Sequence, residues 1–153
     1  MPATVELHDS SPPIGPPHAL LVVLEASPAL HGVTFVLDRA RMRFGRSRSS
    51  NEIVLEGEGI SRRHGRFERR DEGQWWVVDN ATTDGTYVNG EAIPPSEAWY
   101  DGQYRFEQRG SSIVKVGPFL TRYEPRGRPL YDGDRVRAGR VTLEFRFPSA
   151  PTT

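Results

Sequence analysis

Turn-forming residues interrupt this chain so often that a fold built on long helices is disfavoured. Its 153 residues include 15 glycines and 13 prolines. Between them stand short runs rich in β-branched and aromatic residues, such as LLVVLE at 20–25 and QWWVVD at 74–79. At 141–147, apolar and polar side chains alternate with the period of a half-buried strand. These runs predict an all-β domain whose strands follow one another without intervening helices, as in a sandwich.

Charge and cysteine content exclude several classes of function. The formal net charge is zero, so no global field draws the chain to nucleic acid or to an anionic membrane. There is no cysteine, which excludes thiol catalysis, disulfides and cysteine-ligated metals. The first eighteen residues do not show the basic segment followed by an apolar core that is typical of a secretory signal, and no apolar run is long enough to span a bilayer. We therefore expect a cytoplasmic protein without metal or cofactor.

The distribution of proline divides the chain into regions. Residues 1–18 contain five prolines and no periodic pattern, so we expect a disordered tail there, and a second one at 149–153. The folded domain is expected to span residues 19–148. Within it, residues 94–127 are irregular and rich in aromatic side chains.

Three segments at expected strand ends combine arginine, hydroxyl and glycine residues. They read FGRS at 44–47, SRRH at 61–64 and TTDGTYVNG at 82–90. Loops of a rigid sandwich gather at its ends and are free to carry function. A guanidinium supplies charge and bidentate geometry for a phosphate, hydroxyls and backbone N–H groups fill its other acceptors, and glycine permits close approach. The three segments together predict a site for a doubly charged oxyanion.

The order of these segments, followed by PLYDGDRVRAG at 129–139, resembles the forkhead-associated (FHA) domain, a family that reads phosphothreonine peptides. The resemblance runs from about Leu20 to Phe147. It implies a β-sandwich of about eleven strands with the peptide site on the loops at one end. It also implies a phosphothreonine-containing partner in Ser/Thr kinase signalling, and a neighbouring domain of a larger signalling protein as a further partner.

The resemblance assigns roles to particular positions. Arg46 would reach the phosphate, Ser61 would donate its hydroxyl, Arg62 would add a second cation, and Thr83 would contact the phosphate and the threonine methyl. The positions that match structural residues of the family are Gly45, His64, Gly85 and Asn89. They would hold the loops through turns, close packing and a buried hydrogen bond, with Asn89 bridging neighbouring loops.

One position departs from the family pattern. The family usually has Asn-Gly-Thr where this chain has Asp84, Gly85 and Thr86. A carboxylate at neutral pH only accepts hydrogen bonds, so it cannot provide the amide donor of asparagine. Two unit charges about 6 Å apart repel by roughly 3 kcal/mol at an effective dielectric near 20, before screening. We expect Asp84 to weaken or alter peptide preference without abolishing binding.

The stretch at 94–127 looks like an insertion. Forty positions separate Gly90 from Leu130, where the family has a short connection, and an unstructured loop of that length is uncommon. We expect an added β-ribbon or hairpin packed on the sandwich, which either covers its own aromatic side chains or offers a second interaction surface. An alternative alignment would place the family's next strand at WYDGQYRF, but DGDRVRAG matches better.

Three other functions compete with phosphothreonine reading. One is a phospho-independent interaction or oligomerisation module that acts through the insertion. Another is nucleic-acid binding through the basic strands, which would show a steep dependence on salt. An enzyme is the least favoured, since we find no catalytic pair, metal-ligand spacing or nucleotide-binding loop. The sequence therefore favours a non-enzymatic module that binds neither nucleic acid nor membrane.

Overall fold

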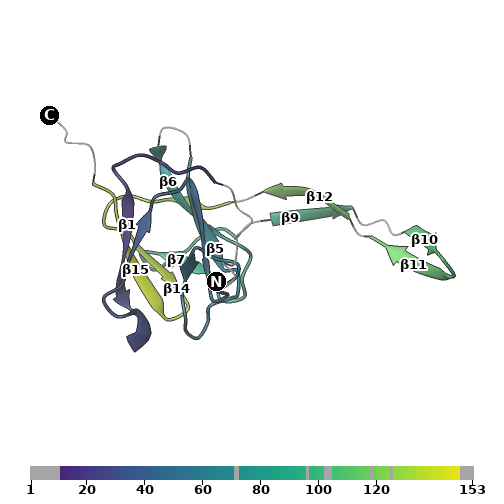
Figure 1. Cartoon of the computed structure of the whole chain (residues 1–153), viewed down its shortest axis with the longest axis horizontal. Helices are drawn as coiled ribbons and strands as arrows, with labels where there is room; N and C mark the ends of the chain where they lie inside the picture. Colours follow the sequence, from purple (N-terminus) through teal and green to yellow (C-terminus); the bar gives the residue numbers. More distant parts are fainter. Residues whose placement is uncertain are drawn as a thin grey trace, which may run out of the picture.

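The computed structural model describes residues 11–70, 73–95, 97–101, 105–117, 119–124 and 126–148. Its body is a sandwich of two sheets (Figure 1). The larger sheet has six strands, all paired antiparallel. In spatial order they are β2 (Thr34–Leu37), β1 (Ala19–Glu25), β15 (Val141–Arg146), β14 (Arg135–Ala138), β7 (Thr86–Val88) and β8 (Glu91–Ala92).

The second sheet has five strands. In spatial order they are β13 (Arg128–Pro129), β6 (Trp75–Asp79), β5 (Gly65–Arg69), β3 (Arg41–Gly45) and β4 (Ile53–Val54). Its pairs are antiparallel except for β3 and β4, which run parallel. In the described part of the chain, one short 3-10 helix, η1 (Pro28–Leu30), connects β1 to β2. The expected all-β sandwich of about eleven strands is confirmed.

The core lies between the two sheets and follows the expected alternation. Along β15, Val141, Leu143 and Phe145 are buried, whereas the residues between them are partly exposed. The adjacent tryptophans of β6 separate in the same way. Trp75 is buried in the core, and Trp76 lies outside beneath the Arg70 guanidinium, 4.1 Å from the ring centroid. Alternating burial along β1 and β15 thus determines which of their side chains remain on the surface.

The expected β-ribbon is present in the insertion, but it does not pack on the sandwich. Strands β9 (Glu97–Asp101) and β12 (Phe119–Glu124) pair antiparallel, and so do β10 (Arg105–Arg109) and β11 (Ser112–Val116). Figure 1 shows the two pairs extending away from the sandwich one after the other. The expectation of packing is therefore wrong. In each pair the inward-facing backbone groups are hydrogen-bonded between the two strands, and both strands are edges whose outward-facing groups are open to solvent.

The ends of the chain are described only in part. Of the tails predicted at 1–18 and 149–153, residues 1–10 and 149–153 lie outside the described residues, whereas residues 11–18 are described and the expectation of disorder does not hold for them. From Ser11 onward the chain already contacts the sandwich. The Ser11 hydroxyl donates to the Arg41 carbonyl at 2.9 Å, the Ile14 amide donates to Asp38, and the Ile14 side chain packs against the core. The first strand begins at Ala19, and no helix in the described ranges is long and apolar enough to cross a membrane.

Candidate functional site

Arg46 and Ser61 lie side by side at one end of the five-stranded sheet. Arg46 directly follows β3, and its backbone amide donates to the Ser61 carbonyl at 3.0 Å. The next amide, that of Ser47, donates to the Arg62 carbonyl at 3.1 Å. The Arg46 side chain is exposed, and its Nε donates to the Ile60 carbonyl at 3.3 Å. The structure therefore brings together the two residues that the sequence predicts for the phosphate.

The close approach of these two loops requires glycine at position 45. A Cβ atom built on Gly45 would collide with the Arg62 carbonyl oxygen and would lie 2.9 Å from the His64 amide nitrogen. Both contacts are with backbone, so a side chain would push the loops apart. The predicted structural role of Gly45 thus has a steric cause.

Asn51 also holds these loops together, although sequence reasoning missed it. Its side chain is buried, and Nδ2 donates to the carbonyls of Ser47 and Arg62, at 2.7 Å each. An asparagine after a serine-rich stretch resembles an ordinary turn residue in sequence. Only the fold reveals that it bridges two loops.

His64 connects the second loop to the third. Its side chain is completely buried. The Ser61 amide donates to Nδ1 at 3.1 Å, so the ring proton must lie on Nε2, which then donates to the Gly85 carbonyl at 2.9 Å. The carboxylate of Asp79 lies 3.7 Å from Nε2. The neutral imidazole therefore fixes the separation of the Ser61 and Gly85 loops.

Asp79 shapes the third loop and is a second residue that the sequence analysis missed. Its buried carboxylate accepts hydrogen bonds from the Thr82 amide (3.0 Å) and hydroxyl (2.7 Å), and from the Thr86 hydroxyl (2.8 Å). The Thr82 hydroxyl in turn accepts from the Gly85 amide at 3.0 Å. Gly85 has a φ of 79°, a conformation that favours glycine.

Thr83 and Asp84 occupy the exposed tip of this loop. The Asp84 Oδ2 atom lies 3.4 Å from where a Cβ on Gly59 would stand, so the carboxylate lies against the segment that leads to Ser61. Arg62, next to Ser61, is exposed as well. All five predicted ligand residues thus belong to three neighbouring loops.

Asn89 lies elsewhere than the resemblance suggests. It does bridge two segments: Nδ2 donates to the Asp134 carboxylate at 3.0 Å, and Oδ1 accepts from the Arg135 amide at 2.9 Å. However, it follows the end of β7 that is opposite to Gly85. Four residue steps along a strand separate the two by roughly 13 Å. Asn89 therefore stabilises the far end of the sandwich and does not support the candidate site.

The arrangement is suited to binding an anion. Two exposed arginines and a hydroxyl lie on loops that are held rigidly by buried polar side chains, and Asp84 is the acidic member of the set. Among the residues that the structure describes, no cluster of three or more His, Asp or Glu side chains is placed to hold a metal ion.

Comparison with known proteins finds relatives of part of this chain. The family model described as FHA domain matches residues 42–103, from β3 into the ribbon. The oxoglutarate dehydrogenase inhibitor of Corynebacterium diphtheriae is 40% identical over 89 residues, which cover 58% of each protein. Across the first curated relatives, this chain spans about half of their length.

Solved structures share the fold at low sequence identity. The solution structure of an FHA domain from Arabidopsis thaliana has a TM-score of 0.58 and 24% identity, covering 95% of this chain and 98% of that one. EmbR of Mycobacterium tuberculosis, solved with a low-affinity phosphopeptide, has a TM-score of 0.56 and 20% identity, covering 89% of this chain and 26% of EmbR.

The ambiguous alignment of the two Asp-Gly segments is also decided by the fold. The family match ends at residue 103, within the first of them. In the structure, however, the second segment leads into β14, which pairs with β7 on one side and β15 on the other. The DGDRVRAG segment is therefore the one that belongs to the sandwich.

Proposed function

Because this chain belongs to the forkhead-associated (FHA) domain family, we propose that it binds a phosphothreonine-containing segment of a partner protein in Ser/Thr kinase signalling. It acts as an interaction module and not as an enzyme, and it works in the cytoplasm. We also propose that the binding domain spans residues 19–148, with residues 94–127 as an insertion.

The observation that carries this proposal is the contact between the Arg46 and Ser61 loops. Phosphothreonine has nearly two negative charges and three acceptor oxygens. Arg46 supplies a charged planar donor, and Ser61 supplies a hydroxyl on the loop to which Arg46 is hydrogen-bonded. Arg62 adds positive charge from the same loop, and Thr83 contacts the peptide from the third loop.

Rigid loops favour tight recognition by such a site. Gly45, His64 and Gly85 set the distances between the three loops through backbone contact and hydrogen bonds that are already made without ligand. Little ordering is then required on binding, and that lowers the entropic cost of capturing a peptide.

The proposal is tested by titrating the protein with a degenerate phosphothreonine peptide library and its non-phosphorylated counterpart. We expect binding of the phosphorylated peptides only, and at least a roughly tenfold loss of affinity in Arg46→Ala, since a charge-assisted hydrogen bond contributes about 1.5–3 kcal/mol. Arg146→Ala is the matched control. This variant also loses one guanidinium, but at the last residue of β15, and we expect it to bind phosphopeptides with normal affinity. Equal binding of both libraries would contradict the proposal, as would full affinity in Arg46→Ala.

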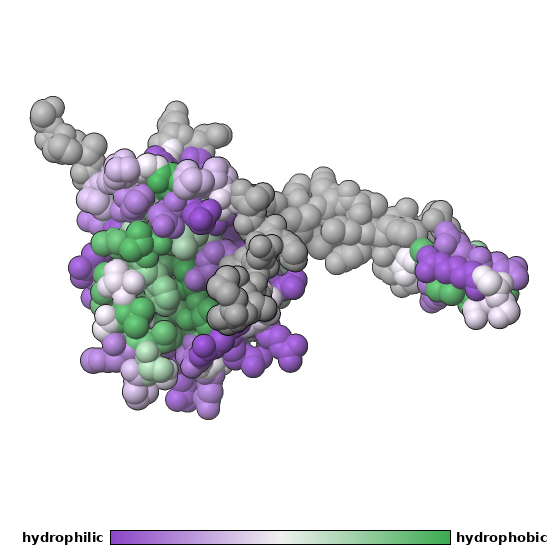
Figure 2. Space-filling model, viewed as in Figure 1, coloured by the Kyte–Doolittle hydropathy of each residue, from purple (hydrophilic) through white to green (hydrophobic). Residues whose placement is uncertain are grey.

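A second candidate function is interaction through the ribbon. Phe106 and Ile113 are 69% and 72% exposed. In the register of β10 and β11, Phe106 is opposite Lys115 and Gln108 is opposite Ile113, so both apolar side chains share one face. Figure 2 shows hydrophobic and hydrophilic side chains mixed at the far end of the ribbon. Sedimentation of the protein and of a Phe106→Ser, Ile113→Ser variant tests self-association. A monomer at all concentrations would exclude oligomerisation through this face.

A further inference from the structure

The outer face of the six-stranded sheet becomes apolar at its β1 and β2 edge. Alternate residues of β1, such as Leu21, are buried in the core, so Leu20 and Val22 point outward and are half-buried. Val36 on β2 is directly opposite Leu20 and is 44% exposed. We call Leu20, Val22 and Val36 the β1–β2 patch. Figure 2 shows hydrophobic side chains gathered on the part of the sandwich where Figure 1 places β1.

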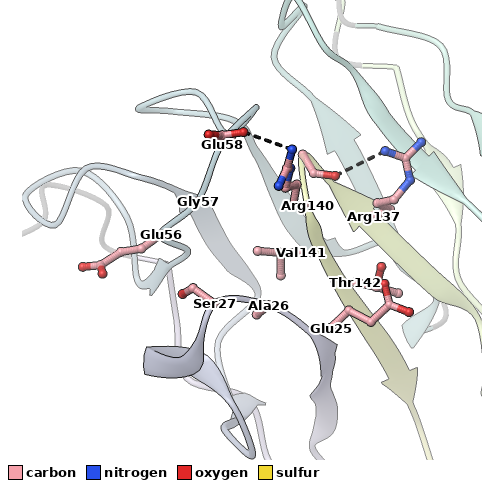
Figure 3. A pocket seen from close by; sticks show the side chains of 11 residues that line it. Glu25, Ala26, Ser27, Glu56, Gly57, Glu58, Arg137, Arg140, Val141 and Thr142 are labelled. Carbon is pink, nitrogen blue, oxygen red and sulfur yellow. Dashed lines mark hydrogen bonds and ion pairs between the residues drawn. The ribbon is translucent and has the colours of Figure 1, made fainter.

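The neighbouring strands keep this face polar. The outward side chains of β15 and β14 are those of Thr142, Glu144, Arg146, Arg135 and Arg137. Arg146 is opposite Leu20 and Glu144 is opposite Val22, so charged groups border the patch along β15 (Figure 3 shows the other end of this strand, at Val141 and Thr142). A sheet face that meets only water is normally polar, and an apolar area with a polar rim is typical of an interaction surface.

The ribbon presents a second apolar surface. Phe106 and Ile113 share one side of β10 and β11, and we call this pair the ribbon face. Within the described ranges, the large apolar side chains that remain exposed are those of Val36, Phe106, Ile113 and Tyr131. Three of these four belong to the β1–β2 patch or to the ribbon face. The exposed apolar surface is thus concentrated at two places.

The two surfaces lie at opposite edges of the sandwich. The patch is on the first two strands of the sheet order β2-β1-β15-β14-β7-β8, and the ribbon follows β8 at the other edge. Five strand spacings, roughly 24 Å, separate β2 from β8. Figure 1 shows the ribbon extending away from the sandwich on the side opposite β1. The ribbon face therefore cannot reach the patch of its own molecule, but it can reach that of a second copy.

We propose that the ribbon face of one molecule docks on the β1–β2 patch of a second copy of this chain. The inference rests on the second candidate function, for which it assigns the surface that the ribbon meets, and it is independent of phosphothreonine binding. Phe106 is the aromatic anchor, a residue type enriched at the centre of such contacts. Because the two surfaces differ, each molecule gives one ribbon and receives another, and the association continues head to tail. Each surface is small, so the contact is weak and forms at high protein concentration.

The experiment is sedimentation velocity on the protein and on two kinds of variant, each checked for folding by circular dichroism. Phe106→Ser with Ile113→Ser removes the ribbon face, and Val36→Asp places a charge in the patch. We expect each variant to associate with itself at least roughly tenfold more weakly than the parent, the cost of truncating an interface anchor. An equimolar mixture of the two should form a one-to-one complex and nothing larger, since one intact ribbon meets one intact patch. Tyr131→Ser, which removes an exposed apolar side chain outside both surfaces, is the matched control and should associate like the parent.

The outcomes separate the two proposals. A parent protein that stays monomeric up to about 1 mM overturns both the patch assignment and self-association through the ribbon. If the ribbon variant is monomeric but Val36→Asp still associates with itself, the ribbon meets something other than the patch, and only the present inference is overturned. The same holds if the mixture of the two variants forms no complex. Should Val36→Asp fail to fold, Val22→Thr, which keeps a β-branched side chain on β1, replaces it with the same expected results.

Discussion

A single buried imidazole shows how one residue organises the site. Both ring nitrogens of His64 are used, one as acceptor for the Ser61 amide and one as donor to the Gly85 carbonyl. Because only the neutral ring with its proton on Nε2 can make both bonds, the two loops have a fixed spacing. This contact fixes the loops that carry the candidate ligands, and the Arg46 side chain is held in addition by its hydrogen bond to the Ile60 carbonyl.

The Asp84 side chain is expected to lower the affinity for phosphopeptides. Its carboxylate lies at the exposed tip of the third loop and would repel a bound phosphate dianion. Asp84→Asn removes that charge and restores an amide donor, so we expect phosphothreonine peptides to bind several-fold tighter in isothermal titration. Asp38→Asn, the same change beyond the far end of β2, is the control. Unchanged affinity in Asp84→Asn would show that the carboxylate does not face the phosphate.

A site residue could be predicted when it belongs to a short motif, and not when its hydrogen-bond partners are distant in the sequence. Arg46, Ser61 and His64 stand in ordered short motifs, so the sequence indicates them directly. Asp79 and Asn51 act through backbone groups brought near by folding, and a buried polar residue carries no local signal of this. Asn89 belongs to the same motif as Gly85, but β7 carries it to the opposite end of the sandwich.

Strand β5 carries a charged cluster on its outer face. Glu68 accepts hydrogen bonds from Arg66 at 2.9 Å and from Arg70 at 2.6 Å. Burial alone would raise the pKa of the Glu68 carboxyl. The hydrogen bonds and charges of the two arginines outweigh burial and hold this pKa below its ordinary value of 4.5. The ionised carboxylate therefore stabilises the folded strand.

This depressed pKa predicts a pH dependence of stability. A group whose pKa is lower in the folded state stabilises the fold above its unfolded pKa, and the contribution disappears as the pH falls through the folded value. Glu68→Gln should reduce the free energy of unfolding by about 1 kcal/mol at pH 7, measured by urea denaturation. The difference from the native protein should vanish in acid. Glu144→Gln, whose partner Arg146 is exposed, should have little effect. A gap that stays constant from neutral to acid pH would contradict the assignment.

The elements themselves were largely predictable, because alternating burial and turn residues are local signals. The sequence predicts a ribbon in this region, but the Asp101-Gly102 dipeptide does not mark its hairpin turn. Strand β9, which ends at Asp101, pairs with β12, and the turn lies between β10 and β11. The direction of the ribbon could not be predicted. Whether a hairpin lies on a sheet or extends from it depends on contacts with distant strands, and these leave no pattern within the hairpin.

For the whole molecule, the sandwich is complete without the ribbon. In the part of the chain that the structure describes, the eleven sandwich strands pair with one another and the four ribbon strands pair with one another. Residues 96–125 can therefore be replaced by a short Gly-Ser turn between Pro95 and Arg126. We expect the thermal midpoint and the phosphopeptide affinity to be retained, with stability raised on the order of 1 kcal/mol because a shorter connection costs less closure entropy. An unfolded product in circular dichroism would show that the ribbon supports the core.

The place where the ribbon leaves the sandwich has a consequence for how such a protein can diversify. It departs between β8 and β13, the edge strands of the two sheets, and Arg128 links these edges through Val88 and Glu91. Strands β8 and β13 are each only two residues long, so they offer few unpaired backbone groups to an additional strand. A different insertion can therefore replace the ribbon between β8 and β13 and supply another interaction surface, while the strand pairing of both sheets is kept.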